Sequence, residues 1–443
     1  MSSSYFASLP ELPFDEIFGL LHDFQNDPHP NRVNLAAGIY RTDEDKSWPL
    51  DIVCKVEKQL YKEASLTRHD YLPIEGDKRF LSLARNLLFN PTNDATAPMT
   101  EAEELRIASV QTVSGTGANH LGALFVVQNL QPQNLWVSDP TWANHHVIWE
   151  AAGLTPRLYP YHRKSDHMLD FDGMVQILEE AQPRDCILLH ACAHNPTGID
   201  PSKDQWKAIA ALCRRKQLVP FFDAAYQGFV SGDLSQDAWA IRYFFQQGLE
   251  MIVAQSFSKN FGLYGHRVGA IHVILPEPSS DIRARVFSGL CHLLRSEISM
   301  APKYGSTIVK TVLESRNLTA GWIADLQAMS GRLRSMRKAL YSELVRLNTP
   351  GLWEHIVNQI GMFSYTGLSA KEVQSLRVDF HIYLLESGRI SITGLNSRNV
   401  KYVAQAFHAV RRKSLEYTAV NGTDGHGTRY GEIQSVIQDV RET

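Results

Sequence analysis

Cysteine is scarce in this chain, and long apolar runs and an excess of one charge are absent. The 443 residues include five cysteines, an odd number with no CxxC spacing, so neither a disulfide framework nor a metal site is expected. No apolar run approaches the length of a membrane-spanning helix. The formal net charge of -3 favours neither nucleic acid nor a membrane as a partner.

Targeting segments are lacking as well. Met1 to Tyr5 provide no basic segment followed by an apolar core, and no arginine-rich transit peptide is present. Together with the scattered cysteines, which suit a reducing compartment, this predicts a cytoplasmic protein. The composition, 44% hydrophobic and 21% charged, is that of a globular chain long enough for two domains.

Two patterns follow one another along the chain. Between about residues 110 and 275 apolar strands alternate with helical segments, which predicts an α/β fold with a mostly parallel sheet covered on both faces. Beyond Pro276 long helices and short strands take over. We expect an N-terminal arm with part of a small domain (1–48), a large domain (49–325), a smaller α+β domain (326–415) and a flexible tail (416–443).

A lysine directly follows one of the predicted strands. The apolar run Met251 to Ala254 leads into Gln255 to Arg267, which contains Lys259 between two serines and two glycines. Lysine is almost never fully buried unless it is paired, so its position after a core strand is unusual. Taken alone, it is better explained as a surface lysine at the start of a helix than as a reactive group.

Other unusual residues also follow predicted strands. They are Ser114-Gly115-Thr116, Trp142, Asn195, and Asp223 with Tyr226. Each has an ordinary structural explanation, such as a helix cap, an interface aromatic or an ion pair. Ligands of open α/β sheets, however, bind outside the carboxyl ends of the strands. A hydrophobic core does not require these residues to lie together at one edge of the sheet. Their predicted convergence there therefore indicates a ligand site.

These residue types are the parts of a pyridoxal phosphate pocket. Backbone N–H groups and hydroxyls at a glycine-rich helix start suit a phosphate. Trp142 offers a surface on which a ring can stack. The carboxylate of Asp223 can keep a ring nitrogen protonated, and Lys259 can form a Schiff base. The glycine-rich stretch lacks the lysine of a phosphate-binding loop and the spacing of a dinucleotide fingerprint.

The chain resembles the aspartate aminotransferase family of fold-type I pyridoxal phosphate enzymes. The resemblance lies in motifs that run in order from about residue 10 to residue 413, among them Tyr71-Leu72-Pro73, Ser114 to Ala118, Pro140-Thr141-Trp142, His190 to Gly198, Pro220 to Asp223, Gln255 to Tyr264 and Ser387-Gly388-Arg389. It implies a seven-stranded, mostly parallel sheet, transfer of an amino group between an amino acid and a 2-oxo acid, and a homodimer with shared active sites.

The resemblance implies roles for the cofactor-binding residues. Lys259 would hold the cofactor and then move protons, and Asp223, oriented by His145 and His190, would pair with the ring nitrogen. Tyr226 and Asn195 would bond the 3'-oxygen of the ring, on which Trp142 would stack. The phosphate would be held by Ser114, Gly115, Thr116, Ser256 and Arg267, together with Tyr71 from the neighbouring subunit.

The substrate side of the resemblance contains a departure. Arg389 would bind the α-carboxylate, with Gly38, Trp142 and Asn195 beside the substrate. The family's second arginine, which binds the side-chain carboxylate from the partner subunit, is replaced by Thr307, and its usual asparagine by Met300. A carboxylate facing these two residues would be desolvated without a charge partner. We therefore expect weak activity on aspartate and glutamate.

Four readings of the departure remain open. The enzyme transaminates a non-acidic amino acid, aromatic or neutral polar, or it is an ordinary aspartate aminotransferase in which Lys303 or Arg295 supplies the missing charge. Alternatively, the same cofactor serves decarboxylation, elimination or replacement, racemisation or carbon–carbon bond formation. A catalytically silent binding protein is the fourth reading, and it would be expected to lose Lys259, Asp223 or Arg389, all of which are present.

Overall fold

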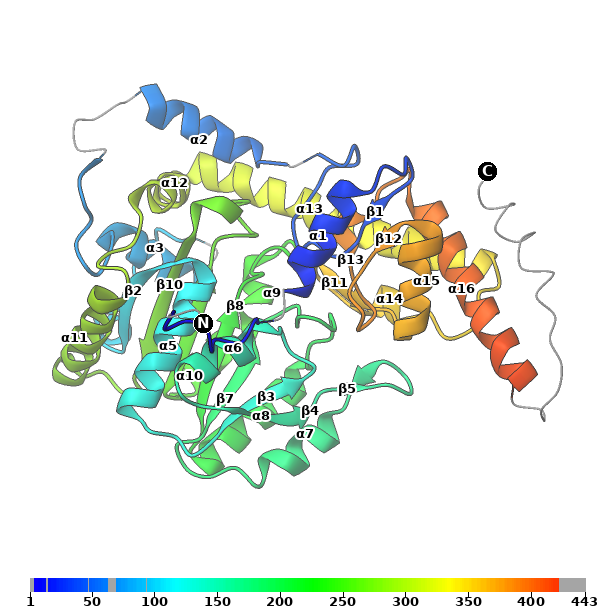
Figure 1. The fold of residues 1–443 in the computed structure, drawn as a ribbon. Coiled ribbons are helices and arrows are strands. Elements are labelled where there is room, and N and C mark those ends of the chain that lie inside the picture. The colour runs from blue at the N-terminus through cyan, green and yellow to red at the C-terminus, as the bar shows by residue number, and fades with distance from the viewer. Residues whose placement is uncertain (1–3, 13–14, 47, 63–68, 93, 422–443) are drawn as a thin grey trace.

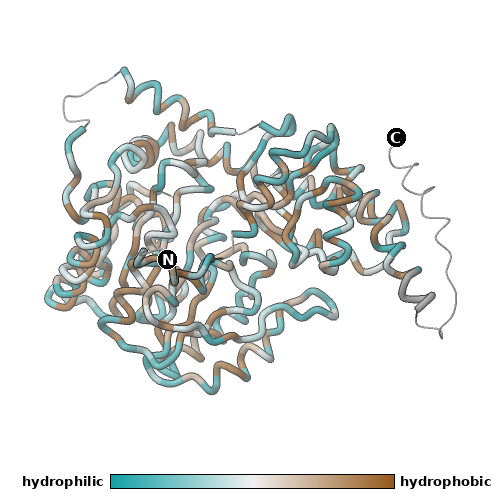
Figure 2. The backbone as a smooth tube through the Cα atoms, in the orientation of Figure 1, coloured by the Kyte–Doolittle hydropathy of each residue, from teal (hydrophilic) through white to brown (hydrophobic). Residues whose placement is uncertain are grey.

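The computed structural model describes residues 4–12, 15–46, 48–62, 69–92 and 94–421 of the chain, with side chains up to residue 416. A large lobe contains the central sheet, and a smaller lobe contains the short strands and the C-terminal helices (Figure 1). Hydrophobic segments concentrate in the strands of the central sheet, as Figure 2 shows. Within the described residues, no helix combines the length and the apolar character needed to cross a membrane.

The central sheet has seven strands, as the resemblance predicts. Their order is β2-β10-β9-β8-β7-β3-β4, and all neighbours are parallel except β10, which runs antiparallel to both β2 and β9. The strands are β2 (Ile107–Val113), β3 (Leu135–Asp139), β4 (Pro156–Pro160), β7 (Cys186–His190), β8 (Val219–Ala224), β9 (Met251–Ser256) and β10 (Val268–Ile274). A two-stranded extension, β5 (His162–Arg163) with β6 (Met168–Leu169), follows β4.

The middle strands are buried on both faces. Every residue of β7, β8 and β9 is buried, which explains why these strands read as continuous apolar runs instead of alternating ones. The helices of the large lobe are α2 (Asp51–Lys62), α3 (Lys78–Phe89), α4 (Glu101–Glu104), α5 (Ser114–Asn129), α6 (Asn144–Ala151), α7 (Phe171–Leu178), α8 (Lys203–Lys216), α9 (Leu234–Asp237), α10 (Trp239–Gln246), η2 (Tyr264–His266), α11 (Ser280–Glu297) and α12 (Lys303–Glu314).

Helix α8 shows how the local sequence defines an element. Ser202 accepts a hydrogen bond from the Gln205 N–H, and the Gln205 side chain accepts one from the Ser202 N–H, which completes a capping box. Three basic residues occupy the last turn, where they favour the helix dipole. Trp206, Ile209 and Leu212 face the core, as their helical spacing predicts.

The smaller lobe combines two short sheets with helices. Its strands form a parallel pair, β1 (Val33–Asn34) with β12 (Ile382–Tyr383), and an antiparallel pair, β11 (Phe363–Tyr365) with β13 (Arg389–Ser391). Its other elements are α1 (Glu16–Asn26), α14 (His355–Asn358), α15 (Ala370–Phe380), η3 (Ile392–Gly394) and α16 (Val400–Asn421). Because β1 pairs with β12, the residues before 48 complete this lobe.

One long helix joins the two lobes. Helix α13 spans Arg316–Arg346 and packs against α2 and α12 of the large lobe and against α14 and α16 of the smaller one. The domain boundary predicted at residues 325 and 326 therefore lies inside a continuous helix. Helix α16 continues to residue 421, so the first residues of the predicted tail are helical, and residues 422–443 lie outside the described residues.

Candidate active site

A cavity of about 230 Å³ opens at the carboxyl ends of the parallel strands, where the two lobes meet. It brings together most of the residues predicted from the sequence, which are Gly38, Ser114, Gly115, Thr116, Trp142, His190, Asn195, Asp223, Tyr226, Ser256, Lys259, Arg267 and Arg389. They come from strand ends and loops far apart in the chain. The edge of the sheet collects them, because parallel strands end on the same side.

Asp223 lies at the floor of this cavity, next to last in β8. Its Oδ2 accepts hydrogen bonds from the Asn119 Nδ2 (3.2 Å) and from the His145 Nε2 (3.1 Å). No described residue donates to its other oxygen. Burial by itself would raise the pKa of this carboxyl, but the hydrogen bond and charge of His145, with the nearby Lys259, hold it below its usual value. Asp223 is therefore an anion in the unliganded site.

Lys259 lies just beyond β9, half-buried and facing the cavity, with its Nζ 5.0 Å from the centre of the Tyr226 ring. Among the described residues it forms no hydrogen bond or ion pair. Burial lowers the pKa of its amine, the Asp223 charge opposes this shift, and the Arg267 charge adds to it. A lysine with a lowered pKa has more of its amine in the neutral, nucleophilic form.

The first turn of α5 forms one end of the cavity. The glycine-rich stretch that the sequence indicated as a turn is itself helical from Ser114 onward. The Ser114 N–H donates to the Arg267 carbonyl oxygen at 3.1 Å, and the Thr116 N–H donates to the Ser114 Oγ at 3.3 Å. Arg267 donates to the Ser114 Oγ at 2.5 Å. A Cβ on Gly115 would come within 2.7 Å of the Ser256 Cβ, so only glycine lets the helix start approach β9 this closely. The start of a helix, two hydroxyls and a guanidinium thus converge on a place suited to a phosphate.

Arg389 closes the cavity from the smaller lobe. The side chain is 3% exposed, and its guanidinium lies 4.2 Å from the centre of the Phe363 ring. Nη2 donates to the Ala36 carbonyl oxygen at 2.6 Å, whereas Nε has no partner. Burial lowers the pKa of this guanidinium to about 10. No described acidic residue pairs with it, so Arg389 has unused donors for a ligand anion.

Two further side chains in the cavity also have unused polar atoms. The Asn195 Oδ1 is buried without a partner, and so are both ring nitrogens of His190. Burial and the neighbouring His145 lower the pKa of His190 to about 3, which keeps it neutral. Buried polar atoms normally have partners, so these orphaned atoms indicate a missing polar ligand. With the carboxylate of Asp223 and the amine of Lys259, the set fits pyridoxal phosphate.

Three predicted residues lie away from the cavity of their own chain. Tyr71 is 87% exposed and does not line the cavity. Met300 and Thr307 are half-buried at and near the start of α12, where the Thr307 hydroxyl donates to the Lys303 carbonyl oxygen at 2.9 Å. The arginine replaced by Thr307 was expected to act across a subunit interface, which this single chain does not contain.

Sequence reasoning missed several residues that line the cavity. Asn119 lies in α5, one turn after the predicted anion site. The hydroxyl oxygen of Tyr264 accepts a hydrogen bond from the Tyr40 N–H at 3.0 Å. Ser258 and Phe363 flank predicted residues, and Ile17 reaches the cavity from α1. Helical spacing was a usable signal for Asn119. Nothing in the local sequence around Ile17 pointed to a site.

Comparisons with known proteins identify the family of the chain. Residues 30–407 match the family described as aminotransferase class I and II. An L-tyrosine:2-oxoglutarate aminotransferase from Aspergillus ustus is 51% identical over 432 residues, which cover 97% of this chain and 82% of the relative. The cytoplasmic aspartate aminotransferase of Schizosaccharomyces pombe is 44% identical over 416 residues, covering 93% of this chain and 99% of the relative.

Solved structures show the same fold. The aspartate aminotransferase from Saccharomyces cerevisiae cytoplasm superposes with a TM-score of 0.88 at 41% identity, covering 93% of this chain and all of the other. An aromatic-amino-acid aminotransferase from Burkholderia pseudomallei, solved covalently bound to pyridoxal phosphate, has a TM-score of 0.87 at 37% identity, with coverage of 92% and 100%.

The fold and the family match define a pyridoxal phosphate-dependent transferase. The chain belongs to the aminotransferase class I and II family, close to the aspartate and aromatic aminotransferases. It is an aminotransferase, its cofactor is pyridoxal phosphate, and its substrates are an amino acid and a 2-oxo acid.

Proposed function

We propose that this aminotransferase takes its amino group from a neutral aromatic L-amino acid and passes it to a 2-oxo acid. One observation carries the proposal: among the described residues that line the cavity the cations are Lys259, Arg267 and Arg389. The first two face the cofactor, and the third is needed for the α-carboxylate. No cation is left in the chain's own cavity for a side-chain carboxylate, and Thr307 occupies the position from which the partner would have supplied one.

The rest of the lining also favours an aromatic side chain. Apolar and aromatic surface in the cavity is contributed by Ile17, Trp142 and Phe363. Burying the ring of a substrate against this surface makes binding more favourable. The relative from Aspergillus ustus, named for L-tyrosine and 2-oxoglutarate, supports the same substrate class. An aspartate:2-oxoglutarate reaction, which the aspartate aminotransferase relatives suggest, is the second candidate.

We assign the cofactor to the residues that the sequence singled out. Ser114, Gly115, Thr116, Ser256 and Arg267 hold the phosphate, and Asp223 holds a proton on the ring nitrogen. Trp142 stacks on the ring, and Asn195 and Tyr226 bond its oxygen. The position of the α5 start, the unpaired Asn195 Oδ1 and the Asp223 oxygen to which no described residue donates support this assignment.

The chain's own residues then set the course of the reaction. Pyridoxal phosphate, when bound, supplies an electron sink that stabilises negative charge at the substrate α-carbon. Arg389 orients the substrate through its carboxylate. The neutral amine of Lys259 takes the proton from the α-carbon and returns it elsewhere, as a general base followed by a general acid. Asp223, kept ionised by His145, holds the ring nitrogen protonated throughout.

A panel of single amino acids tests the substrate class. Mixed one at a time with the cofactor-loaded enzyme, tyrosine and phenylalanine should convert the cofactor to its amino form at least about tenfold faster than aspartate or glutamate, because a desolvated carboxylate without a partner costs several kcal/mol. The visible absorbance of the cofactor follows the reaction, and product analysis separates transamination from decarboxylation or bond formation. Equal rates for aspartate and tyrosine would contradict the proposal.

The exchange Thr307→Arg tests the missing charge. It should raise kcat/KM for aspartate by roughly tenfold or more, because a guanidinium paired with a carboxylate contributes about 1.5–3 kcal/mol. The matched control is Thr311→Arg, one turn further along α12, which should leave aspartate use unchanged. If both variants behave like the wild type, the threonine does not occupy the position of the family arginine.

We further propose a homodimer in which Tyr71 reaches the cofactor of the partner subunit. Tyr71 is 87% exposed, and Tyr5, Phe6, Leu9 and Leu12 of the N-terminal arm are each at least 68% exposed. Such apolar surface favours a partner that covers it. Sedimentation of the purified protein measures the assembly, and a monomer at micromolar concentration would refute the homodimer.

We also propose a cytoplasmic location, which the cytoplasmic relative of Schizosaccharomyces pombe supports. Imaging of a tagged chain tests it.

A further inference from the structure

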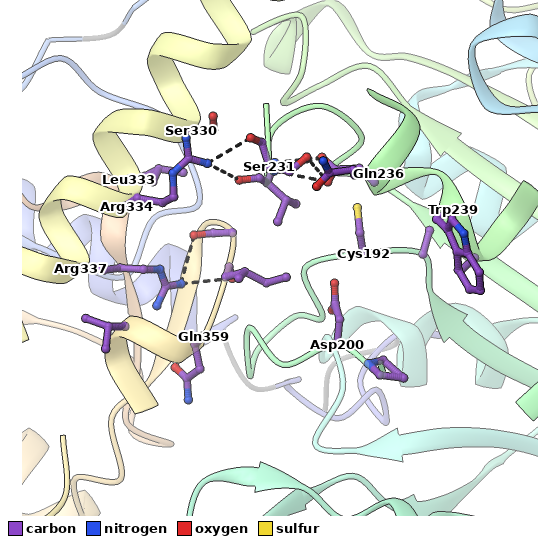
Figure 3. Close-up of a pocket in the computed structure, with 18 of the residues that line it drawn as sticks. Cys192, Asp200, Ser231, Gln236, Trp239, Ser330, Leu333, Arg334, Arg337 and Gln359 are labelled. Atoms are coloured by element: carbon purple, nitrogen blue, oxygen red, sulfur yellow. Dashed lines mark hydrogen bonds between the residues drawn. The ribbon is translucent and has the colours of Figure 1, made fainter. Parts of the chain in front are cut away.

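A second and larger cavity lies behind the active site. It encloses about 860 Å³ between the large lobe and the part of α13 that packs on the smaller lobe. Arg334 and Arg337 extend from α13 on one side, and Cys192, Asp200 and Trp239 face them from the other (Figure 3). None of the residues that line the active-site cavity also lines this one. Its volume is that of a site for a small organic molecule.

The lining of this cavity, here called the rear cavity, carries four cations without acidic partners. They are Lys203 on the large lobe and Arg334, Arg337 and Lys338 on α13. Among the described residues, none of the four forms an ion pair. Arg337 is 2% exposed and donates only to backbone carbonyl oxygens, and its Nε is buried without a partner. A buried guanidinium without a counter-ion is costly unless a ligand anion completes it.

The two acids of the rear cavity form no ion pair with the three cations of α13 and are outnumbered by the four cations, and their oxygens accept hydrogen bonds from backbone N–H groups. Asp237 accepts hydrogen bonds from the N–H groups of Gly228, Val230 and Ser231, and Asp200 accepts from those of Ala193 and His194. Burial outweighs these bonds at Asp237 and raises its pKa to about 6. The rear cavity is therefore positive, and the rings of Trp206, Trp239 and Tyr341 add flat apolar surface to it.

Only one layer of backbone separates the rear cavity from the active site. Ala191 and Cys192 line the rear cavity, whereas His190 and Asn195 of the same segment line the active site. The segment that contains Gly361 and Phe363 forms the other part of this wall, since Gly361 lines the rear cavity and Phe363 lines the active site.

The two segments that form this wall are in direct contact. The Ile360 N–H donates to the Gly198 carbonyl oxygen at 2.7 Å, and a Cβ on Gly361 would come within 2.5 Å of the Ala193 Cβ. Arg337 binds the carbonyl oxygens of Gly361 and Phe363, and the Phe363 ring lies against Arg389. A ligand on Arg337 would thus act on the segment that supports the substrate arginine.

We propose that the rear cavity binds a small organic anion with a flat apolar body, such as an aromatic carboxylate or sulfonate, and that its occupancy is coupled to ligand binding at the active site. The anion pairs with the cations of α13, and its body lies against the aromatic side chains of the large lobe. The anion contacts both lobes and both segments of the wall. Anion binding in the rear cavity and substrate binding in the active site therefore each shift the arrangement of the lobes, so that either ligand changes the affinity of the other. The inference does not depend on which amino acid is the substrate.

Binding of a fluorescent anion tests the site. Anilinonaphthalene sulfonate is titrated into the cofactor-loaded wild type, the double variant Arg334→Gln/Lys338→Gln and the control Arg316→Gln. Arg316 lies on the same helix, is 86% exposed and is outside the rear cavity. The double variant should bind the probe about tenfold more weakly or worse, and the control should match the wild type. Equal affinity in all three proteins would overturn the proposal.

The coupling is tested on the wild type by measuring how a ligand in one cavity changes the affinity of a ligand in the other. An α-methyl amino acid occupies the active site but has no α-hydrogen to lose. At saturation it should change the dissociation constant of the probe by about fivefold or more, and the probe should change the dissociation constant of the α-methyl amino acid by the same factor. If each ligand leaves the affinity of the other unchanged, the coupling is refuted. If the probe inhibits amino transfer by the wild type and inhibits the double variant equally, the probe binds in the active site, and the assignment to the rear cavity is overturned.

Discussion

The exchange Lys259→Ala is expected to reduce the rate of amino transfer by roughly ten-thousandfold or more, because it removes both the cofactor-binding amine and the group that moves the proton. The purified variant should lose the visible absorbance that arises when the cofactor is bound to a lysine. Single-turnover assays with an amino-acid substrate measure the rate, and absorbance spectra measure the bound cofactor. The proposed role of Lys259 rests on its position after β9, on its place in the cavity lining and on its lowered pKa.

Two comparisons separate this role from a general loss of structure. Lys207→Ala removes a surface lysine that pairs with Asp204 in α8, and it should leave both rate and absorbance intact. Adding a small primary amine to Lys259→Ala should restore part of the rate, since the vacated space admits an external base. A variant that stays as active as the wild type, or a wild type that remains colourless with pyridoxal phosphate, would overturn the assignment of this lysine.

The exchange Arg389→Leu is expected to lower kcat/KM by about 100- to 1000-fold, because a bidentate contact to the substrate carboxylate is lost. Arg389→Lys should recover only part of this loss, since an ammonium cannot reproduce the planar fork. Steady-state kinetics with the best amino acid of the panel measure the effect. Amides of the same amino acid, which lack the carboxylate, should discriminate far less between wild type and variant.

The stability of the Arg389 variant distinguishes a binding role from a structural one. In the unliganded protein this guanidinium is buried without an acidic partner, and its Nε has no hydrogen bond. Such a charge costs free energy that only a bound ligand offsets. Arg389→Leu should therefore keep the melting temperature of the unliganded enzyme or raise it. A fall of many degrees together with unchanged discrimination of carboxylates would show that the arginine serves packing.

The two cavities differ in how they use buried charge. In the active site the carboxylate of Asp223 accepts hydrogen bonds from His145 and Asn119, while Lys259 and Arg389 line the cavity. In the rear cavity the acids accept hydrogen bonds from backbone N–H groups, and the one buried cation among its four, Arg337, has no ion-pair partner. Both patterns follow from one rule: a buried charge that the chain leaves without a partner indicates a ligand.

Much of the site could be predicted because strand ends are local features. An apolar run followed by a polar or glycine-rich stretch locates Asp223 and Lys259 at strand ends, and the parallel sheet carries both to one edge. Two features that depend on the packing of distant segments escaped prediction. Asn119 bonds Asp223 only because α5 packs across the sheet, and Ile17 reaches the cavity only because α1 packs on the smaller lobe.

The sequence by itself determined the α/β alternation, the capped helix α8, the lysine after β9 and the absence of an arginine at Thr307, since these depend on short-range periodicity and on residue identity. Only the tertiary structure decided that Arg389 lies against Phe363 without an acid, and that Tyr71 stays outside its own cavity. The tertiary structure also created the rear cavity behind a single layer of backbone. Packing of two lobes around α13 sets these distances, and no local pattern encodes them.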